Sequence, residues 1–223
     1  MSKGPLEFID TDQCEQALPC LWDEPSQAVT TTLILAHGAG APMDSPFMQH
    51  IAQSLAERGV RVVRFEFAYM AQRRVDGRRR PPNPQAHLLQ QWRQVHAQVS
   101  RQVGGPVAIG GKSMGGRMAS LLADELGALA LVCLGYPFYA AGKPEKPRVA
   151  HLAELGTPTL IVQGERDALG NRETVAGYEL SSAVELHWLQ AADHDLKPLK
   201  ASGFSHTQHL EAAVQRIVEY LAT

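Results

Sequence analysis

Short apolar runs recur along most of this chain, and segments with the periodicity of an α-helix lie between them. Most of these runs are almost continuously hydrophobic and rich in β-branched residues, which is typical of strands buried on both faces of a sheet. The runs are Thr30–Ala36, Val60–Phe67, Val107–Gly110, Leu129–Leu134, Thr159–Gln163 and Val184–Leu189.

Three of the intervening segments carry apolar residues that advance by three or four positions. These are Phe47, Ile51 and Leu55 after Ser45; then Leu88, Trp92, Val95, Val99 and Val103; and finally Leu210, Val214, Ile217 and Leu221. Such stripes predict helices that pack one face on a core. The alternation of strands and helices predicts an α/β fold with a mostly parallel, doubly wound sheet of about seven strands, flanked by helices.

The remaining segments connect these elements. We expect the N-terminal stretch Leu6–Pro25 to form an antiparallel hairpin on the sheet edge. Two connections are longer than the rest, Ala68–Pro84 and Gly135–Pro147. Neither is long enough to hold a large helical cap, although the first could form a flap. No internal repeat or linker divides the sequence, so we expect one domain over residues 1–223.

Composition narrows the class of protein. Of the 223 residues 44% are hydrophobic and 20% charged, and the formal net charge is −2. This balance is typical of a globular protein and gives no reason to expect nucleic acid or a membrane as a partner. We find neither a secretory signal nor a membrane-spanning run, and Cys14, Cys20 and Cys133 lack metal-ligand spacing. We therefore expect a cytoplasmic protein with reduced thiols; the sequence makes no prediction of oligomeric state.

The segment Gly111-Lys112-Ser113-Met114-Gly115 matches the pattern G-x-S-x-G. The match follows a predicted strand and opens a predicted helix, which is the setting of a nucleophile elbow. A sharp turn there would hold the Ser113 hydroxyl above the sheet and aim the Met114 N–H at a developing oxyanion. The alternative is a glycine-rich turn in which Ser113 is an ordinary helix N-cap. We expect Arg117, one turn further on, to make a structural ion pair.

A second glycine-rich turn, Ala36-His37-Gly38-Ala39-Gly40, follows the first clear strand. A backbone N–H from such a turn can complete an oxyanion hole, and Ala39 is the preferred donor, with Gly38 or Gly40 as alternatives. His37 could be a general base, but we favour a structural role in which its ring ties the loop to neighbouring backbone. We consider four residues for contacts with substrate: Gly38, Gly40, Lys112 and Tyr69.

A serine nucleophile needs an imidazole base, and the imidazole needs an orienting carboxylate. The expected chain order on this type of fold is serine, acid, histidine. Asp167 follows the strand Thr159–Gln163 and is preferred over Glu165, which lies closer to the strand. His194 follows the last predicted strand and, among nine histidines, alone combines this order with a loop at the carboxyl edge of the sheet.

Two other hypotheses concern the charged residues. His194 and Asp195 with His206 and His209 lack a recognised metal-ligand spacing, so we expect neither a metal nor another cofactor. Five arginines between positions 73 and 80 could recognise an anionic substrate, although a solvated loop is the simpler interpretation.

These residues together resemble the α/β-hydrolase superfamily over nearly the whole chain. The closer resemblance is to a small family of predicted hydrolases, which includes the hydrolase-like domain of the third regulatory subunit of the NSL histone-acetyltransferase complex. Four segments carry it: residues 37–48, 64–70, 111–117 and 193–200. Dienelactone hydrolases look similar in layout but use cysteine where this chain has Ser113. The resemblance implies an α/β-hydrolase fold without a large cap domain, with Ser113, Asp167 and His194 as a catalytic triad.

The sequence therefore predicts a carboxylesterase-like serine hydrolase that cleaves a small ester or thioester through an acyl-enzyme. Fold alone does not establish catalysis, so a non-catalytic interaction module built on the same scaffold is the main alternative. Peptide hydrolysis ranks lower, because nothing in the sequence resembles an additional substrate domain.

Overall fold

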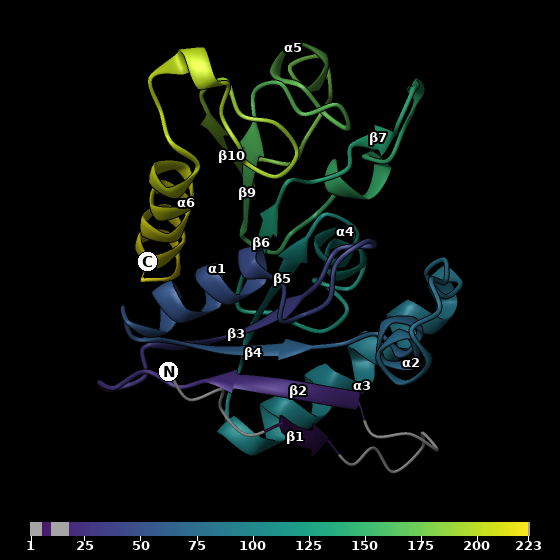
Figure 1. The fold of residues 1–223 in the computed structure, drawn as a ribbon, viewed down its shortest axis with the longest axis vertical. Coiled ribbons are helices and arrows are strands. Elements are labelled where there is room, and N and C mark those ends of the chain that lie inside the picture. Colours follow the sequence, from purple (N-terminus) through teal and green to yellow (C-terminus); the bar gives the residue numbers. More distant parts are fainter. Residues whose placement is uncertain (1–5, 10–17, 223) are drawn as a thin grey trace.

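The computed structural model describes residues 6–9 and 18–222, and its central feature is an eight-stranded sheet in the order β1-β2-β4-β3-β5-β6-β9-β10 (Figure 1). β1 pairs antiparallel with β2 and β2 pairs antiparallel with β4, whereas the strands from β4 to β10 pair in parallel. The strands are β1 (Leu6–Ile9), β2 (Leu18–Asp23), β3 (Thr31–Ala36), β4 (Val60–Phe65), β5 (Ala108–Lys112), β6 (Leu131–Leu134), β9 (Thr159–Gly164) and β10 (Val184–Leu189).

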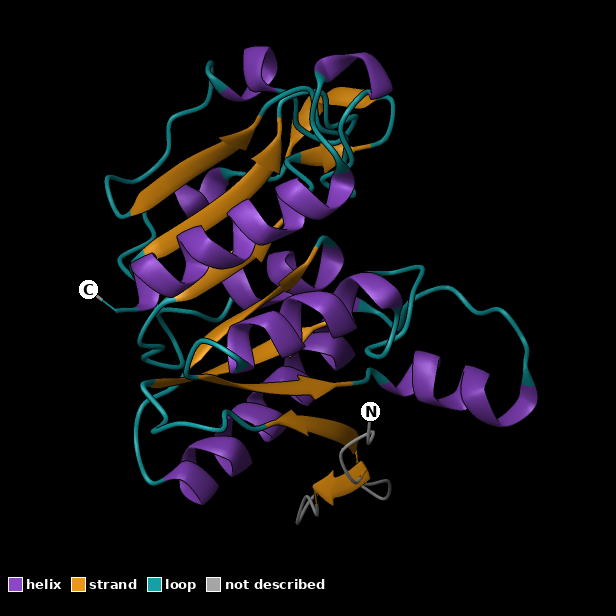
Figure 2. Cartoon of the chain, turned by 60° about the vertical axis from the view of Figure 1, so that its left-hand side comes forward, coloured by secondary structure: helices purple, strands orange, loops and turns teal. Residues whose placement is uncertain are grey.

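Helices cover both faces of this sheet, as Figure 2 shows. The main ones are α1 (Pro46–Ala56), α3 (Gln85–Val103), α4 (Met114–Ser120) and α6 (His206–Leu221). Alternate residues of β3 face opposite ways: Ile34 packs with α3 and α4, whereas Leu33 and Leu35 pack with α1 and α6. Because both faces are buried, the central strands carry apolar residues at almost every position.

The architecture confirms the predicted fold class. Each of the six apolar runs contains a strand, with ends that differ by up to two residues, and the three periodic segments form α1, α3 and α6. The N-terminal hairpin is present as β1 paired with β2, while residues 10–17 between them lie outside the described residues. The hairpin brings the sheet to eight strands, against about seven expected.

The two long connections contain regular structure that we did not predict. The first forms α2 (Ala68–Asp76), of which only Tyr69 and Met70 are buried, and Gly77 ends the helix in a left-handed conformation. The second forms a small hairpin of β7 (Tyr139–Ala140) and β8 (Lys143–Pro147). Both pack little apolar surface, so hydrophobic periodicity gave no signal for them.

Short elements complete the described chain: η1 (Ala150–Leu152), α5 (Arg172–Val175) and η2 (Lys200–Ser202). Cys20 and Cys133 are buried, and Cys14 lies outside the described residues, so the expectation of reduced thiols stays a prediction. Among the described helices, none has the length and hydropathy needed to cross a membrane.

Candidate active site

Ser113 lies in a strained turn between β5 and α4. Its φ of 52° and ψ of −115° place it in a region that residues with a side chain rarely adopt. The strand and helix on either side pack closely against β3, because a Cβ atom on Gly111 or on Gly115 would lie 2.6 Å from the carbonyl oxygen of Ala36. Glycine is therefore needed at both positions for this turn to form.

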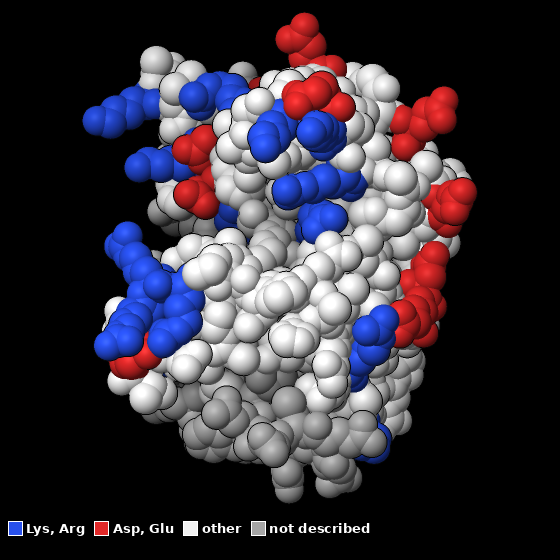
Figure 3. Space-filling view, turned by 90° about the vertical axis from the view of Figure 1, so that its right-hand side faces the viewer, with Lys and Arg blue, Asp and Glu red and all other residues white. Residues whose placement is uncertain are grey.

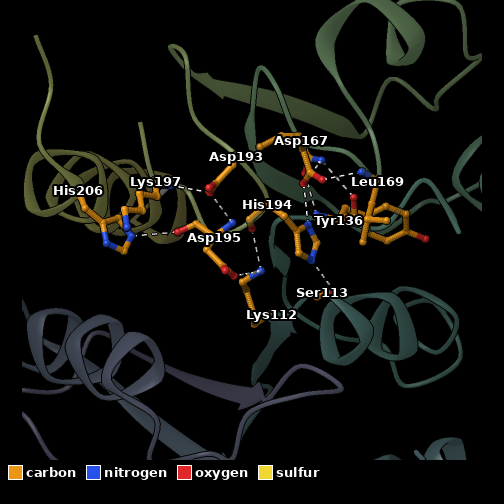
Figure 4. A network of polar contacts seen from close by, with 11 residues as sticks. Lys112, Ser113, Tyr136, Asp167, Leu169, Asp193, His194, Asp195, Lys197 and His206 are labelled. Carbon is orange, nitrogen blue, oxygen red and sulfur yellow. Dashed lines mark hydrogen bonds and ion pairs between the residues drawn. The ribbon is translucent and has the colours of Figure 1, made fainter. Parts of the chain in front are cut away.

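A continuous chain of hydrogen bonds links Ser113, His194 and Asp167 (Figure 4). Ser113 Oγ lies 2.8 Å from His194 Nε2, and His194 Nδ1 lies 2.7 Å from Asp167 Oδ2. The serine precedes α4, the acid follows β9 and the histidine follows β10, so all three lie at the carboxyl edge of the parallel strands. The three residues selected from the sequence thus meet at one point.

The contacts of the His194 ring fix the direction of its hydrogen bonds. Ionised Asp167 only accepts hydrogen bonds, so Nδ1 carries the ring proton and donates it to Oδ2. The lone pair of Nε2 then faces Ser113 Oγ and accepts the hydroxyl proton. This is the arrangement that general-base activation of a serine requires.

Asp167 is completely buried, and both of its oxygens accept hydrogen bonds. Oδ1 accepts from the Leu169 N–H at 2.7 Å, and Oδ2 accepts from Gln163 Nε2 at 2.8 Å in addition to His194. The Gln163 amide is itself oriented, because its Oε1 accepts the Tyr136 N–H at 2.7 Å. We did not predict this role for Gln163. The available signal was a polar residue near the end of the buried apolar strand β9, four positions before the acid.

The competing acid and the other histidines lie in different surroundings. Glu165 accepts the Ala191 N–H at 2.9 Å and pairs with Arg172, and these bonds lower its pKa. His187 lies on β10, His87 and His96 lie on α3, and His206 and His209 lie on α6. None of these groups joins the chain of bonds at Ser113.

His37 holds the glycine-rich turn after β3 through both ring nitrogens. Nδ1 donates to the Gly38 carbonyl at 2.7 Å, and Nε2 accepts the Phe67 N–H at 3.1 Å. Burial lowers the pKa of His37, which favours the neutral ring that these two bonds require. The ring is therefore fully engaged with backbone, in agreement with the structural role expected from the sequence.

The same bonds orient the peptide group between Gly38 and Ala39. In a trans peptide the carbonyl and the N–H point in opposite directions, so the Ala39 N–H points away from His37. Gly38 lies against the nucleophile, since a Cβ atom placed on it would lie 3.7 Å from Ser113 Cβ. Within residues 6–9 and 18–222, neither the Ala39 N–H nor the Met114 N–H donates a hydrogen bond. Both are free to donate to a substrate oxygen.

The four candidates for substrate contact differ in their solvent exposure and in whether their polar groups already make hydrogen bonds. Gly38 is buried, whereas Gly40 is exposed at the site. The Tyr69 hydroxyl is already used, because it donates to the Ala39 carbonyl at 3.0 Å and so supports the turn. Lys112 Nζ is likewise engaged, with the His194 carbonyl at 2.8 Å and Asp195 Oδ1 at 3.2 Å.

The ion pair expected at Arg117 is not formed, so that prediction was wrong. Within the described part of the chain its guanidinium has no carboxylate partner, and its closest polar contact is Gln85 Oε1 at 3.4 Å. Burial and the nearby Arg148 lower the pKa of Arg117. The side chain instead reaches Gln85, the first residue of α3, and lies near enough to His151 of η1 to influence its charge.

The arginine-rich segment is only partly neutralised. Arg74 pairs with Glu66 and Asp44, and Arg80 pairs with Asp76. Arg73 Nη1 reaches the Gly40 carbonyl at 3.4 Å, which brings it next to the glycine-rich turn. Figure 3 shows that basic side chains gather over α2 and the segment after it, and again over the β7–β8 hairpin.

No group of three or more histidine, cysteine, aspartate or glutamate residues with the geometry of a metal site occurs among the residues described.

Comparisons with known proteins identify the family and the fold of this chain. Residues 29–222 match the family model described as an alpha/beta hydrolase domain. An alpha-beta serine hydrolase homologue from Coxiella burnetii is 19% identical, with a TM-score of 0.71 over 100% of this chain and 97% of that one. A serine hydrolase without lid from Xanthomonas campestris is also 19% identical, with a TM-score of 0.70 over 97% and 96% of the two chains.

Dienelactone hydrolase from Anabaena variabilis has a TM-score of 0.73 at 19% identity, over 97% of this chain and 95% of that one. These neighbours share the fold, which includes the dienelactone-hydrolase layout inferred from the sequence, while the closer likeness to the NSL-complex subunit stays a prediction. The match over residues 29–222 shows that the chain belongs to the alpha/beta hydrolase domain family.

Proposed function

We propose that this protein is a serine hydrolase that cleaves a small carboxylic ester or thioester through an acyl-enzyme on Ser113. The observation that carries the proposal is the unbroken chain from Ser113 Oγ to His194 Nε2 and from His194 Nδ1 to Asp167. Family membership supports a hydrolase, and the unpaired N–H groups beside the serine support acyl transfer.

Acylation begins when His194 Nε2 removes the hydroxyl proton as Ser113 Oγ attacks the carbonyl carbon of the substrate. Asp167 holds the ring in the Nδ1–H form and stabilises the imidazolium that results. When the tetrahedral intermediate collapses, the bond to the leaving group breaks. The leaving alcohol or thiol takes the proton from Nε2, which leaves the acyl group on Ser113 and a neutral ring.

Deacylation repeats these steps with water. His194 Nε2 takes a proton from a water molecule, whose oxygen attacks the ester carbon on Ser113. Collapse of this second intermediate returns the proton to Ser113 Oγ and releases the carboxylic acid. The enzyme is regenerated without any redox change.

The N–H groups of Ala39 and Met114 would hold the carbonyl oxygen as it becomes negative. Ala39 is oriented by the His37 contact to the Gly38 carbonyl, and Met114 is the first residue of α4, where the helix dipole favours negative charge. Donors fixed in advance in this way contribute on the order of 3 kcal/mol each to transition-state stabilisation.

The elements around Ser113 favour small substrates. The additions at this edge are the short helix α2 and the β7–β8 hairpin, and the neighbour from Xanthomonas campestris is described as a hydrolase without lid. An open site would bury little of a long acyl chain, so we expect short-chain esters or thioesters to be preferred. No cofactor is part of this reaction.

The direct test is hydrolysis of a short p-nitrophenyl ester by the wild type and by Ser113→Ala. We expect hydrolysis by the wild type and a fall in kcat of at least ~10³-fold in the variant, because the nucleophile and its base act as one unit. Circular dichroism and a thermal melt would establish that the variant is folded. Equal rates for the two folded proteins, across ester and thioester panels, would instead favour a non-catalytic interaction module.

A further inference from the structure

The segment that carries His194 reaches Ser113 across two intervening strands. β5 and β10 are separated in the sheet by β6 and β9, and the two residues are 81 positions apart in sequence. We call residues 190–198, which follow β10, the base loop. Ala191 and Leu196 of this loop have φ values of 54° and 60°, so its backbone is held in a shape that non-glycine residues seldom adopt. Something must fix this loop relative to the serine.

Most contacts of the base loop are made within itself or to the segment after β9. Asp193 Oδ1 accepts the N–H groups of Asp195 and Lys197, and the Arg166 N–H donates to the Ala192 carbonyl. These bonds shape the loop and attach it to the segment that carries Asp167. They do not attach it to the strand that carries the nucleophile.

Lys112 supplies the connection to the nucleophile strand. It is the last residue of β5, directly before Ser113, and its Nζ lies 2.8 Å from the His194 carbonyl oxygen and 3.2 Å from Asp195 Oδ1. Figure 4 shows the side chain rising from the strand to the backbone beneath His194. In the described part of the chain these are the sole polar contacts between residues 108–120 and the base loop, apart from the Ser113–His194 bond itself.

The Lys112 side chain lies in a confined place. The residue is 8% exposed, and Phe47 of α1 presents its ring with the centroid 5.6 Å from Nζ. A Cβ atom on Gly135 would lie 3.2 Å from Lys112 Nζ and 3.4 Å from His194 Nδ1. Gly135 has a φ of 64°, so both sterics and backbone favour glycine there. The ammonium group and the imidazole ring therefore flank the same small space.

We propose that Lys112 is a positioning residue, which ties the base loop to the nucleophile strand and places a positive charge beside His194. The proposal rests on the proposed function, since it concerns the geometry of the same serine and histidine. Lys112 does not touch the reacting atoms. It acts by fixing the backbone from which the His194 ring projects.

Two consequences follow from this arrangement. First, loss of the ammonium group would let the His194 ring drift relative to Ser113, and misplacement by about 1 Å can cost a hundredfold in rate. Second, loss of the positive charge would make protonation of the neighbouring imidazole easier. The other charged groups that face Lys112 are Asp195, Asp193 and Asp167; all are acidic and would remain, so they would reinforce this second effect.

The test uses the full-length protein with Lys112→Met, which keeps an unbranched side chain but removes the charge and the donors. We expect kcat for a short p-nitrophenyl ester to fall by roughly 10- to 100-fold with little change in KM. We also expect the midpoint of the acidic limb of the kcat/KM profile to move to higher pH by about half a unit to one unit. Rates are normalised to sites titrated with a fluorophosphonate, so that misfolded protein does not contribute.

Three further variants separate positioning from general damage. Lys112→Arg keeps the charge, so the midpoint of the pH profile should return to the wild-type value even where kcat stays low. Asp195→Asn leaves the bond from Lys112 to the His194 carbonyl and removes an exposed partner, so kcat should fall by only about threefold. Lys200→Met is the matched control: the same chemical change at an exposed residue beyond the base loop should leave both kcat and the profile unchanged.

The possible results are distinct. A folded Lys112→Met protein with kcat within about twofold of wild type and an unshifted profile overturns the proposal. A raised KM with unchanged kcat also overturns it, and assigns Lys112 to substrate binding instead. Failure of the proposed function is recognised separately, because the wild type itself would then show no hydrolysis that depends on Ser113.

Discussion

Two serine–histidine contacts of equal length lie close together in this molecule. Ser113 Oγ is 2.8 Å from His194 Nε2, and Ser120 Oγ is 2.8 Å from His151 Nε2. One serine precedes α4 and the other ends it. A search for a serine within bonding reach of an imidazole would find both, so the distance alone does not distinguish a nucleophile from a structural hydroxyl.

The two pairs differ in where the hydroxyl proton goes. Ser120 Oγ donates to the Arg117 carbonyl at 2.8 Å, so it can only accept from His151 Nε2. His151 then carries its proton on the nitrogen that faces the serine and has no lone pair available there. At Ser113 no carbonyl competes within the described residues, and the hydroxyl proton points to His194. Ser113 can therefore pass its hydroxyl proton to His194, whereas Ser120 cannot pass its proton to His151.

The pairs differ also in the charge behind the ring. His194 has the buried carboxylate of Asp167 on Nδ1, which stabilises a protonated ring. Burial and, to a smaller extent, the nearby Arg117 together lower the pKa of His151 to about 4. A ring that resists protonation is a poor general base near neutral pH. A serine therefore becomes a nucleophile when its hydroxyl donates to the imidazole and a carboxylate supports the other side of the ring. The distance between serine and histidine is not sufficient.

Removal of the charge behind the catalytic ring should have the largest effect. In Asp167→Asn the side-chain amide can donate to His194 and reverse the ring tautomer, so we expect kcat to fall by about 10⁴-fold. The amide must also face donors from Gln163 and Leu169, which adds a cost in stability. Steady-state hydrolysis measures the first effect and chemical denaturation the second. A folded variant that loses less than about tenfold would mean that the carboxylate does not orient the base.

A change in the Ser120–His151 pair should lower stability and leave activity unchanged. Ser120→Ala removes the partner of His151 Nε2 in a buried setting, so we expect unfolding free energy to fall by about 1–2 kcal/mol. Ester hydrolysis should stay at the wild-type rate, because Ser120 is 2% exposed and has no access to substrate. Denaturant titration and kinetics on the same preparation test both statements. A large loss of activity at full stability would show that the second pair takes part in catalysis.

The smallest effect concerns how stability depends on pH. The pKa of His151 is about 4 in the folded protein, whereas the ordinary pKa of a histidine is 6.5. Between these values the unfolded chain binds more protons than the folded one, so this residue lowers stability as pH falls through that window. His151→Gln removes the effect. The stability of the variant relative to wild type should therefore rise by about 1 kcal/mol between pH 7 and pH 4.5, after allowance for partial exposure.

Denaturant titrations of the wild type and the variant at several pH values measure this difference in stability. The contributions of all other titratable groups are the same in both proteins and cancel. A difference that stays flat with pH would mean that His151 is as easily protonated in the folded protein as in the unfolded chain.

The sequence was sufficient for the sheet and for the residues that meet at its edge. Continuous apolar runs predicted the parallel strands, and the turn Gly111–Gly115 placed Ser113, because the strain there needs a particular pattern of glycines. Asp167 and His194 were found by their position after strands, since strand ends converge in a parallel sheet.

What the sequence did not reveal depends on contacts between distant segments. Lys112 acts through His194, 82 positions away, and the Gln163 amide is oriented by Tyr136, 27 positions away. No local periodicity encodes such contacts. The expected ion pair of Arg117 failed for the same reason: one residue's charge does not tell which neighbours the fold will bring to it. Helix α2 was missed because it buries only Tyr69 and Met70, so its arginine-rich surface looked like a loop.

The most direct measurement of the central claim is labelling by a fluorophosphonate, with the modified residue mapped by mass spectrometry. We expect a single equivalent of label on Ser113, none on Ser120, and none on folded Ser113→Ala or His194→Ala. Absence of label on folded wild-type protein, or label that persists on Ser113→Ala, would contradict the assignment of Ser113 as an activated nucleophile.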